Sequence, residues 1–144
     1  MNSQKDKFDN ILRKSGLRYT PQRQAVLDEL NRTDDHRDVE EIYFSLKERD
    51  LNVSRATVYR TLEILVNHQL VRRLDLGEGK YRFESRNRKH HDHIICLDCN
   101  KIMEFVNERI EELQDEIAKE YGFSLTKHVH QLFGRCLDDN CPNK

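Results

Sequence analysis

Apolar residues recur at helical spacing through the first half of the chain. In residues 4–15, Phe8, Ile11 and Leu12 fall on one face of a helix. Three further segments show the same period, and each follows a residue that caps helices well: Thr20 with Pro21 after it, Asp38, and Ser54. Their expected inward residues are Val26, Leu27, Leu30, Val39, Ile42, Tyr43, Leu46, Val58, Leu62, Leu65 and Val66.

The pattern changes after residue 70. Residues 71–76 and 80–84 read as strands, and Gly77-Glu78-Gly79 between them predicts a β-hairpin. Four helices followed by a hairpin is the order of a winged helix-turn-helix domain.

The second half predicts a smaller α/β unit. Residues 91–96, 101–106 and 124–133 read as strands, and residues 107–121 as a helix that ends at Gly122. The helix is expected to turn Ile110, Leu113 and Ile117 inward. We therefore predict an α+β protein with a winged-helix domain at 1–85, a basic linker at 86–89 and a second domain at 90–144.

Composition limits the class of protein. Hydrophobic residues make up 36% of the 144 residues and charged residues 35%, which suits two small cores. No apolar run reaches the length of a membrane span, and residues 1–7 lack the apolar core of a signal peptide. We expect a cytoplasmic protein with reduced cysteines. Basic residues predominate before residue 90 and acidic residues after it, a modest asymmetry that suits phosphate on one half and cations on the other.

The four cysteines form two close pairs, Cys96 with Cys99 and Cys136 with Cys141. Zinc prefers four soft ligands at tetrahedral corners, and a short spacing lets one turn supply two of them. Small buried thiols are the alternative, but two close pairs favour a structural zinc site.

A run of possible metal ligands, His90-His91-Asp92-His93, precedes the first cysteine pair. Side chains alternate along a strand, so His91 and His93 point one way while His90 and Asp92 point the other. One run thus starts two sites. Candidates for the missing ligands are His36, Glu84, Glu104, Glu111 and His128. A surface cluster of no function is the alternative, and His68 and His130 are read as structural or surface residues.

The fourth helix carries a polar face opposite its apolar stripe. This face holds Arg55, Ala56, Tyr59, Arg60 and Glu63. Arginine reads guanine or phosphate in the major groove, and alanine or a tyrosine edge contacts a thymine methyl. Arg18, together with Arg72, Arg73 and Arg82 of the hairpin, is placed to reach phosphates or the minor groove. An ordinary solvated helix face is the alternative.

Together these segments resemble the ferric uptake regulator (Fur) superfamily of metal-responsive repressors. The matching segments are residues 16–23, 54–62 and 90–99 and the closing cysteine pair. The resemblance implies a homodimer, or a higher oligomer, of winged-helix and dimerisation domains that binds double-stranded DNA at an A·T-rich palindromic operator and has no membrane partner.

The resemblance also implies three metal sites. The structural Zn(II) falls on Cys96, Cys99, Cys136 and Cys141. A regulatory site between the domains falls on His36, Glu84, His91, His93 and Glu104. A second site falls on His90, Asp92, Glu111 and His128. Arg18, Arg55, Tyr59 and Arg60 are the expected DNA contacts.

The superfamily has iron, zinc, manganese and peroxide-sensing branches. The peroxide branch usually has Asp where this chain has Glu84 and Glu104, and one common type of zinc sensor needs a further cysteine, so the resemblance favours Fe(II) over Mn(II) or Zn(II). The rival from another class is a zinc hydrolase, but the chain has no His-Glu-x-x-His motif, and we expect no enzymatic activity. The recognition helix argues against a third reading, a metal-buffering protein.

Overall fold

The computed structural model describes residues 4–77, 79–86, 89–137 and 141. The chain divides into two compact units, Met1–Arg88 and Lys89–Lys144. Of the predicted linker 86–89, residues 87 and 88 lie outside the described residues, as does Glu78 of the hairpin turn. No helix among the described residues has both the length and the apolar character that a bilayer crossing requires.

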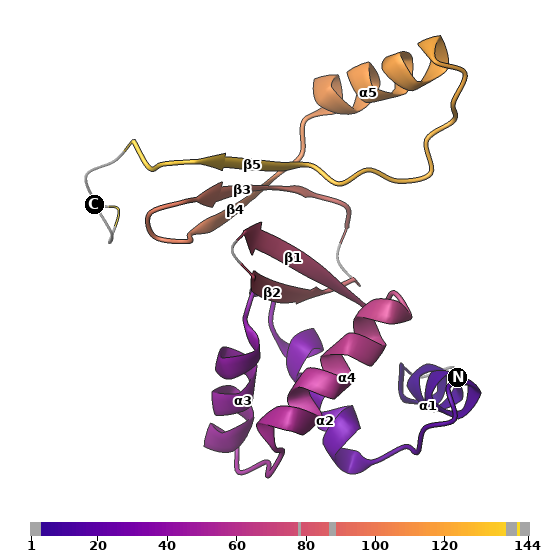
Figure 1. Ribbon diagram of the computed structural model, residues 1–144, viewed down its shortest axis with the longest axis vertical. Coiled ribbons are helices and arrows are strands. Elements are labelled where there is room, and N and C mark those ends of the chain that lie inside the picture. The colour runs from indigo at the N-terminus through magenta and orange to yellow at the C-terminus, as the bar shows by residue number, and fades with distance from the viewer. Residues whose placement is uncertain (1–3, 78, 87–88, 138–140, 142–144) are drawn as a thin grey trace. The chain divides into compact units, whose positions relative to one another are not determined.

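The first unit contains four helices and a hairpin (Figure 1). The elements are α1 (Gln4–Lys14), α2 (Pro21–Arg32), α3 (Val39–Glu48), α4 (Arg55–Asn67), β1 (Val71–Gly77) and β2 (Lys80–Ser85). The expected caps form, because the Thr20, Asp38 and Ser54 side chains accept hydrogen bonds from backbone N–H groups in the first turns of α2, α3 and α4.

One apolar core joins these elements. Its fully buried members include Phe8, Leu12, Val26, Ile42, Leu46, Val58, Leu62 and Leu65. The predicted inward faces of the four helices are thus confirmed, although Ile11, Val39, Tyr43 and Val66 are only partly buried. β1 and β2 pair antiparallel, and Phe83 of β2 closes the core from the hairpin side.

A buried carboxylate ties α2 to α3. Glu29 of α2 is fully buried and forms ion pairs with Arg32, Arg37 and Arg49. Burial raises the pKa of Glu29, but hydrogen bonds from Arg32, Ser45, Arg37 and Arg49 outweigh it and hold that pKa well below its usual range.

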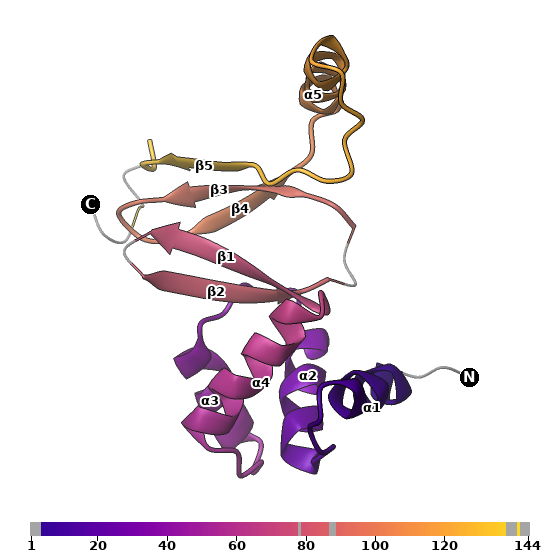
Figure 2. The same ribbon diagram turned by 45° about the vertical axis from the view of Figure 1, so that its right-hand side comes forward.

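The second unit is a three-stranded sheet with one helix. Its elements are β3 (Asp92–Cys96), β4 (Ile102–Phe105), α5 (Glu108–Glu120) and β5 (Gln131–Gly134). The strand order is β4-β3-β5, with β3 antiparallel to β4 and parallel to β5. The two units together give the predicted mixed α+β fold (Figures 1 and 2).

Two expectations for this unit were wrong. Of the strand expected over residues 124–133, only residues 131–133 form a strand, β5, which continues to Gly134. β3 begins at Asp92 and so offers no partner strand to the residues before β5. The inward face expected for α5 is open: Leu113 is 55% exposed and Ile117 is 54% exposed. Within the single chain only Ala118 of this helix is buried. Its apolar stripe is therefore available to a partner.

Candidate metal centres and nucleic-acid face

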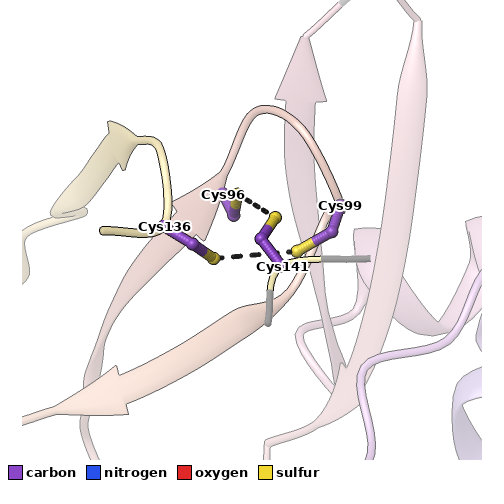
Figure 3. Close-up of side chains that lie close together, drawn as sticks. All are labelled: Cys96, Cys99, Cys136 and Cys141. Atoms are coloured by element: carbon purple, nitrogen blue, oxygen red, sulfur yellow. Dashed lines mark hydrogen bonds between the residues drawn. The ribbon is translucent and has the colours of Figure 1, made fainter. Parts of the chain in front are cut away.

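Parallel pairing brings the two cysteine pairs together. Cys96, the last residue of β3, lies opposite Gly134, the last residue of β5. Because parallel strands end at the same edge, the turn after β3 carries Cys99 to the place where the chain after β5 carries Cys136. Cys141 completes the group (Figure 3).

The sulfur separations match a tetrahedral zinc site. The Sγ atoms of Cys96 and Cys141 lie 3.7 Å apart, and those of Cys99 and Cys136 lie 3.9 Å apart. All four Sγ atoms lie within 4.8 Å of one another. Four sulfurs at about 2.3 Å from one zinc are separated by about 3.8 Å, whereas a disulfide needs about 2.05 Å. The four free thiols therefore fit a metal better than a disulfide.

The thiols favour different protonation states. A hydrogen bond to the Cys99 backbone lowers the pKa of Cys96 to about 6. Hydrogen bonds with the Cys96 and Cys141 side chains raise the pKa of Cys136 to about 12. Thiolates this close repel one another, so full ionisation of the group requires a cation, which zinc would supply if it bound there.

An ion pair joins the two cysteine-bearing segments directly. Asp98, between Cys96 and Cys99, pairs with Arg135, the residue before Cys136. Sequence reasoning missed this contact, because nothing in the local pattern links an exposed arginine to an aspartate in a distant turn.

The second cluster lies wholly within this unit. It consists of His90, Asp92, Glu111 and His128. His90 and His128 approach through their Nε2 atoms at 3.0 Å. The Oδ1 atom of Asp92 lies 3.1 Å from His128 Nε2 and 3.5 Å from His90 Nε2, and Glu111 Oε1 lies 3.4 Å and 3.3 Å from the same two atoms.

These separations suit one small cation. Nitrogen and oxygen ligands at about 2.1 Å from a metal lie about 3.0–3.4 Å apart in octahedral or tetrahedral geometry. Two imidazole nitrogens 3.0 Å apart do not both carry a proton without repulsion. Asp92 is buried, and its charge favours a positive partner. The donor set therefore fits a divalent metal.

The residues expected at the regulatory site belong to both units, so each part is described by itself. In the first unit, His36 Nε2 lies 2.7 Å from Glu84 Oε2. The backbones of Arg37 and Phe83 exchange two hydrogen bonds. These bonds place His36, which precedes Arg37, beside Glu84, which follows Phe83. In the second unit, His91 Nε2 lies 3.0 Å from Glu104 Oε2, and the rings of His91 and His93 are 4.7 Å apart.

The alternation of side chains along the histidine run agrees with these positions. The rings of His91 and His93 meet edge to face near Glu104, while His90 and Asp92 lie close to Glu111 and His128.

The outer face of α4 is open to solvent. Arg55, Tyr59 and Arg60 are exposed, while Val58, Thr61, Leu62 and Leu65 are buried. A hydrogen bond to Glu63, together with the charge of that carboxylate, raises the pKa of Tyr59, so the phenol stays protonated. Arg18, between α1 and α2, is also exposed.

One exposed residue of this face, Arg55, is paired with a residue of α3. Arg55 Nε lies 3.0 Å from Glu40 Oε1 and 3.1 Å from Glu40 Oε2, on α3. Its guanidinium carbon lies 4.4 Å from the centroid of the Tyr43 ring. Helical periodicity finds Arg55, but it cannot find Glu40, whose role arises only from the packing of two helices.

Comparison with known proteins agrees with these features. Residues 14–133 match the family model "Ferric uptake regulator family". The ferric uptake regulation protein of Campylobacter jejuni is 47% identical over 137 residues, covering 94% of this chain and 87% of the relative.

Solved structures are also similar. The Helicobacter pylori ferric uptake regulator Fur, described as having three functional metal binding sites, has a TM-score of 0.83 and 36% identity, covering 92% of this chain and 88% of that chain. The structure of the Pseudomonas aeruginosa ferric uptake regulator with manganese has a TM-score of 0.78 and 34% identity, covering 90% of this chain and 98% of that chain.

The matched segment spans both units and includes the recognition helix, the histidine run and the first cysteine pair. Members of this family are metal-binding transcriptional regulators that bind DNA and work as dimers, and they are not enzymes. The chain belongs to the ferric uptake regulator family and is a metal-responsive transcriptional regulator.

Proposed function

We propose that this protein is an Fe(II)-dependent repressor of metal-uptake genes that acts in the cytoplasm as a homodimer on an A·T-rich palindromic operator. The regulatory metal would bind His36, Glu84, His91, His93 and Glu104. The observation that carries the proposal is the division of these ligands between the two units: His36 and Glu84 lie together in one, and His91 and Glu104 lie together in the other.

A metal held by both units acts as a clamp. Its binding free energy favours whichever relative orientation of the units brings all the ligands to one point. If that orientation also places both recognition helices of the dimer in successive major grooves, metal and DNA each strengthen binding of the other.

The ligand chemistry is compatible with Fe(II). The regulatory donors are imidazole nitrogens and carboxylate oxygens, which suit Fe(II) and Mn(II). All four cysteines belong to the other cluster, so none is left to make the regulatory site softer. Mn(II) and Zn(II) are the alternatives that the same donors accept.

The other two sites have different tasks. The four cysteines would hold a structural zinc that folds the end of the second unit. His90, Asp92, Glu111 and His128 would bind a second metal within one unit, which stabilises that unit without setting its orientation.

Sequence recognition is assigned to α4. Tyr59 and Arg60 would contact bases in the major groove, and Arg18 would contact phosphate and add sequence-independent affinity. The raised pKa of Tyr59 keeps its phenol neutral, which suits an apolar contact of the ring edge with a thymine methyl.

Operator binding during a metal titration tests the proposal. Zinc-containing protein with the other sites emptied should bind operator DNA tightly only after Fe(II) or Mn(II) is added, and protein from iron-replete cells should contain iron. Equal operator affinity with and without these metals would refute the metal-dependent switch.

A further inference from the structure

Arg55 occupies an unusual place for a cation. It is the first residue of α4, where the helix dipole presents partial positive charge. An arginine there is electrostatically unfavourable unless an anion lies close by. Glu40 provides that anion from the first turn of α3, where its own charge complements a helix N-terminus.

The contacts around Arg55 are directional. Its Nε donates to both carboxylate oxygens of Glu40. The guanidinium carbon lies 4.4 Å from the centroid of the Tyr43 ring and 5.6 Å from the centroid of the Phe44 ring. These two rings meet edge to face. Carboxylate and aromatic faces thus hold the side chain along α3.

The rest of the outer face contrasts with this arrangement. Arg60 lies one and a half turns further along α4, and among the described residues it has no ion-pair partner. Arg55 and Glu40 as a pair carry no net charge toward DNA, whereas Arg60 offers its charge to a phosphate or a base.

We infer that Glu40 offsets the charge of Arg55 and so lowers the sequence-independent affinity of the recognition helix for DNA. This inference rests on the proposed DNA-binding function of α4. Arg55 is then a positioning residue, which fixes the start of α4 against α3, rather than a contact to DNA as its sequence position predicts.

The effect of Glu40 on DNA binding can be measured from the salt dependence of the binding constant, which reports counterion release. Each phosphate contact steepens the plot of log binding constant against log salt by about 0.9. Glu40→Gln frees the Arg55 charge, so the salt slope on random-sequence DNA should steepen by about one, and affinity near 0.15 M salt should rise about three- to fivefold.

A double-mutant cycle on the full-length metal-loaded protein tests this. Arg55→Ala alone should leave the salt slope unchanged, because Arg55 is already neutralised, and Glu40→Gln/Arg55→Ala should return the slope to that of wild type. Glu48→Gln removes an equal charge from the exposed far end of α3 and is the control, expected to leave the slope unchanged.

The outcomes are distinct. If the salt slope of Arg55→Ala is shallower than that of wild type by about one, Arg55 already contacts phosphate. This result would overturn the inference about Glu40 but not the proposed DNA-binding function. An unchanged slope on Glu40→Gln would do the same. If wild-type protein shows no salt-dependent DNA binding, the proposed function fails as well.

Discussion

At the scale of single residues, each cysteine of the four-sulfur group is predicted to be needed for zinc binding. Cys96→Ser removes a thiolate from the four-sulfur group, so the variant should lose most of its zinc and about 3 kcal/mol or more of stability in the second unit. Zinc content and thermal unfolding measure both effects. Leu97→Ser, an exposed change in the same turn, should retain zinc. Full zinc and an unchanged melting temperature in Cys96→Ser would rule out this assignment.

Tyr59 is predicted to read bases through its ring. Tyr59→Ala should cost about 1–3 kcal/mol at the operator and relax the preference for thymine at one position. Tyr59→Phe keeps the ring edge and should lose little. Competition binding with operator and random DNA distinguishes a base-specific contact of Tyr59 from a sequence-independent one. Equal weakening on both DNAs would show that Tyr59 does not read sequence.

At the scale of elements, the Glu29 network joins α2 to α3. Removing one member of a buried ion pair is costly, so Glu29→Gln should destabilise the protein by about 3 kcal/mol near pH 7. The folded pKa of Glu29 is depressed, so its contribution is present above the unfolded pKa of about 4.3 and disappears as pH falls through the folded value.

The difference in unfolding free energy between wild type and Glu29→Gln should therefore stay constant from pH 7 to about pH 5 and shrink below about pH 4. Denaturant unfolding at a series of pH values measures it, and acid loss of metal affects both proteins equally. A difference that grows toward acid pH would contradict the network described here.

Local pattern predicted most of the elements but not their surroundings. Thr20, Asp38 and Ser54 marked helix starts correctly, because capping depends on neighbours in sequence. The face of α5 was misjudged, because periodicity locates Leu113 and Ile117 on one stripe without saying whether the same chain covers it. In a family that works as dimers, the partner subunit is the expected cover.

The metal clusters were predictable only in part, because sequence pattern reports on residues that are close along the chain. Alternation along a strand divides the histidine run, and close cysteine spacing indicates zinc. The contribution of Glu111 from α5 and of His128 from the segment before β5 requires the fold, because these residues lie far from the run in sequence. The ion pair of Asp98 with Arg135 and that of Glu40 with Arg55 had no local signal at all.

At the scale of the whole molecule, the proposed switch depends on which ligands belong to which unit. His36 and Glu84 precede the division at Arg88, and His91, His93 and Glu104 follow it. Every ligand of the second cluster follows it as well. Metal at the proposed regulatory site would therefore link the units, while metal in the second cluster would change only the stability of one.

The ranking of two histidine variants tests this claim most directly. Operator affinity is measured with and without Fe(II) for wild type, His36→Ala and His128→Ala, after each is shown to be a folded, zinc-containing dimer. We expect His36→Ala to abolish the metal-dependent gain in affinity and His128→Ala to retain most of it. A full metal response in His36→Ala, with the response lost in His128→Ala, would refute a clamp at His36.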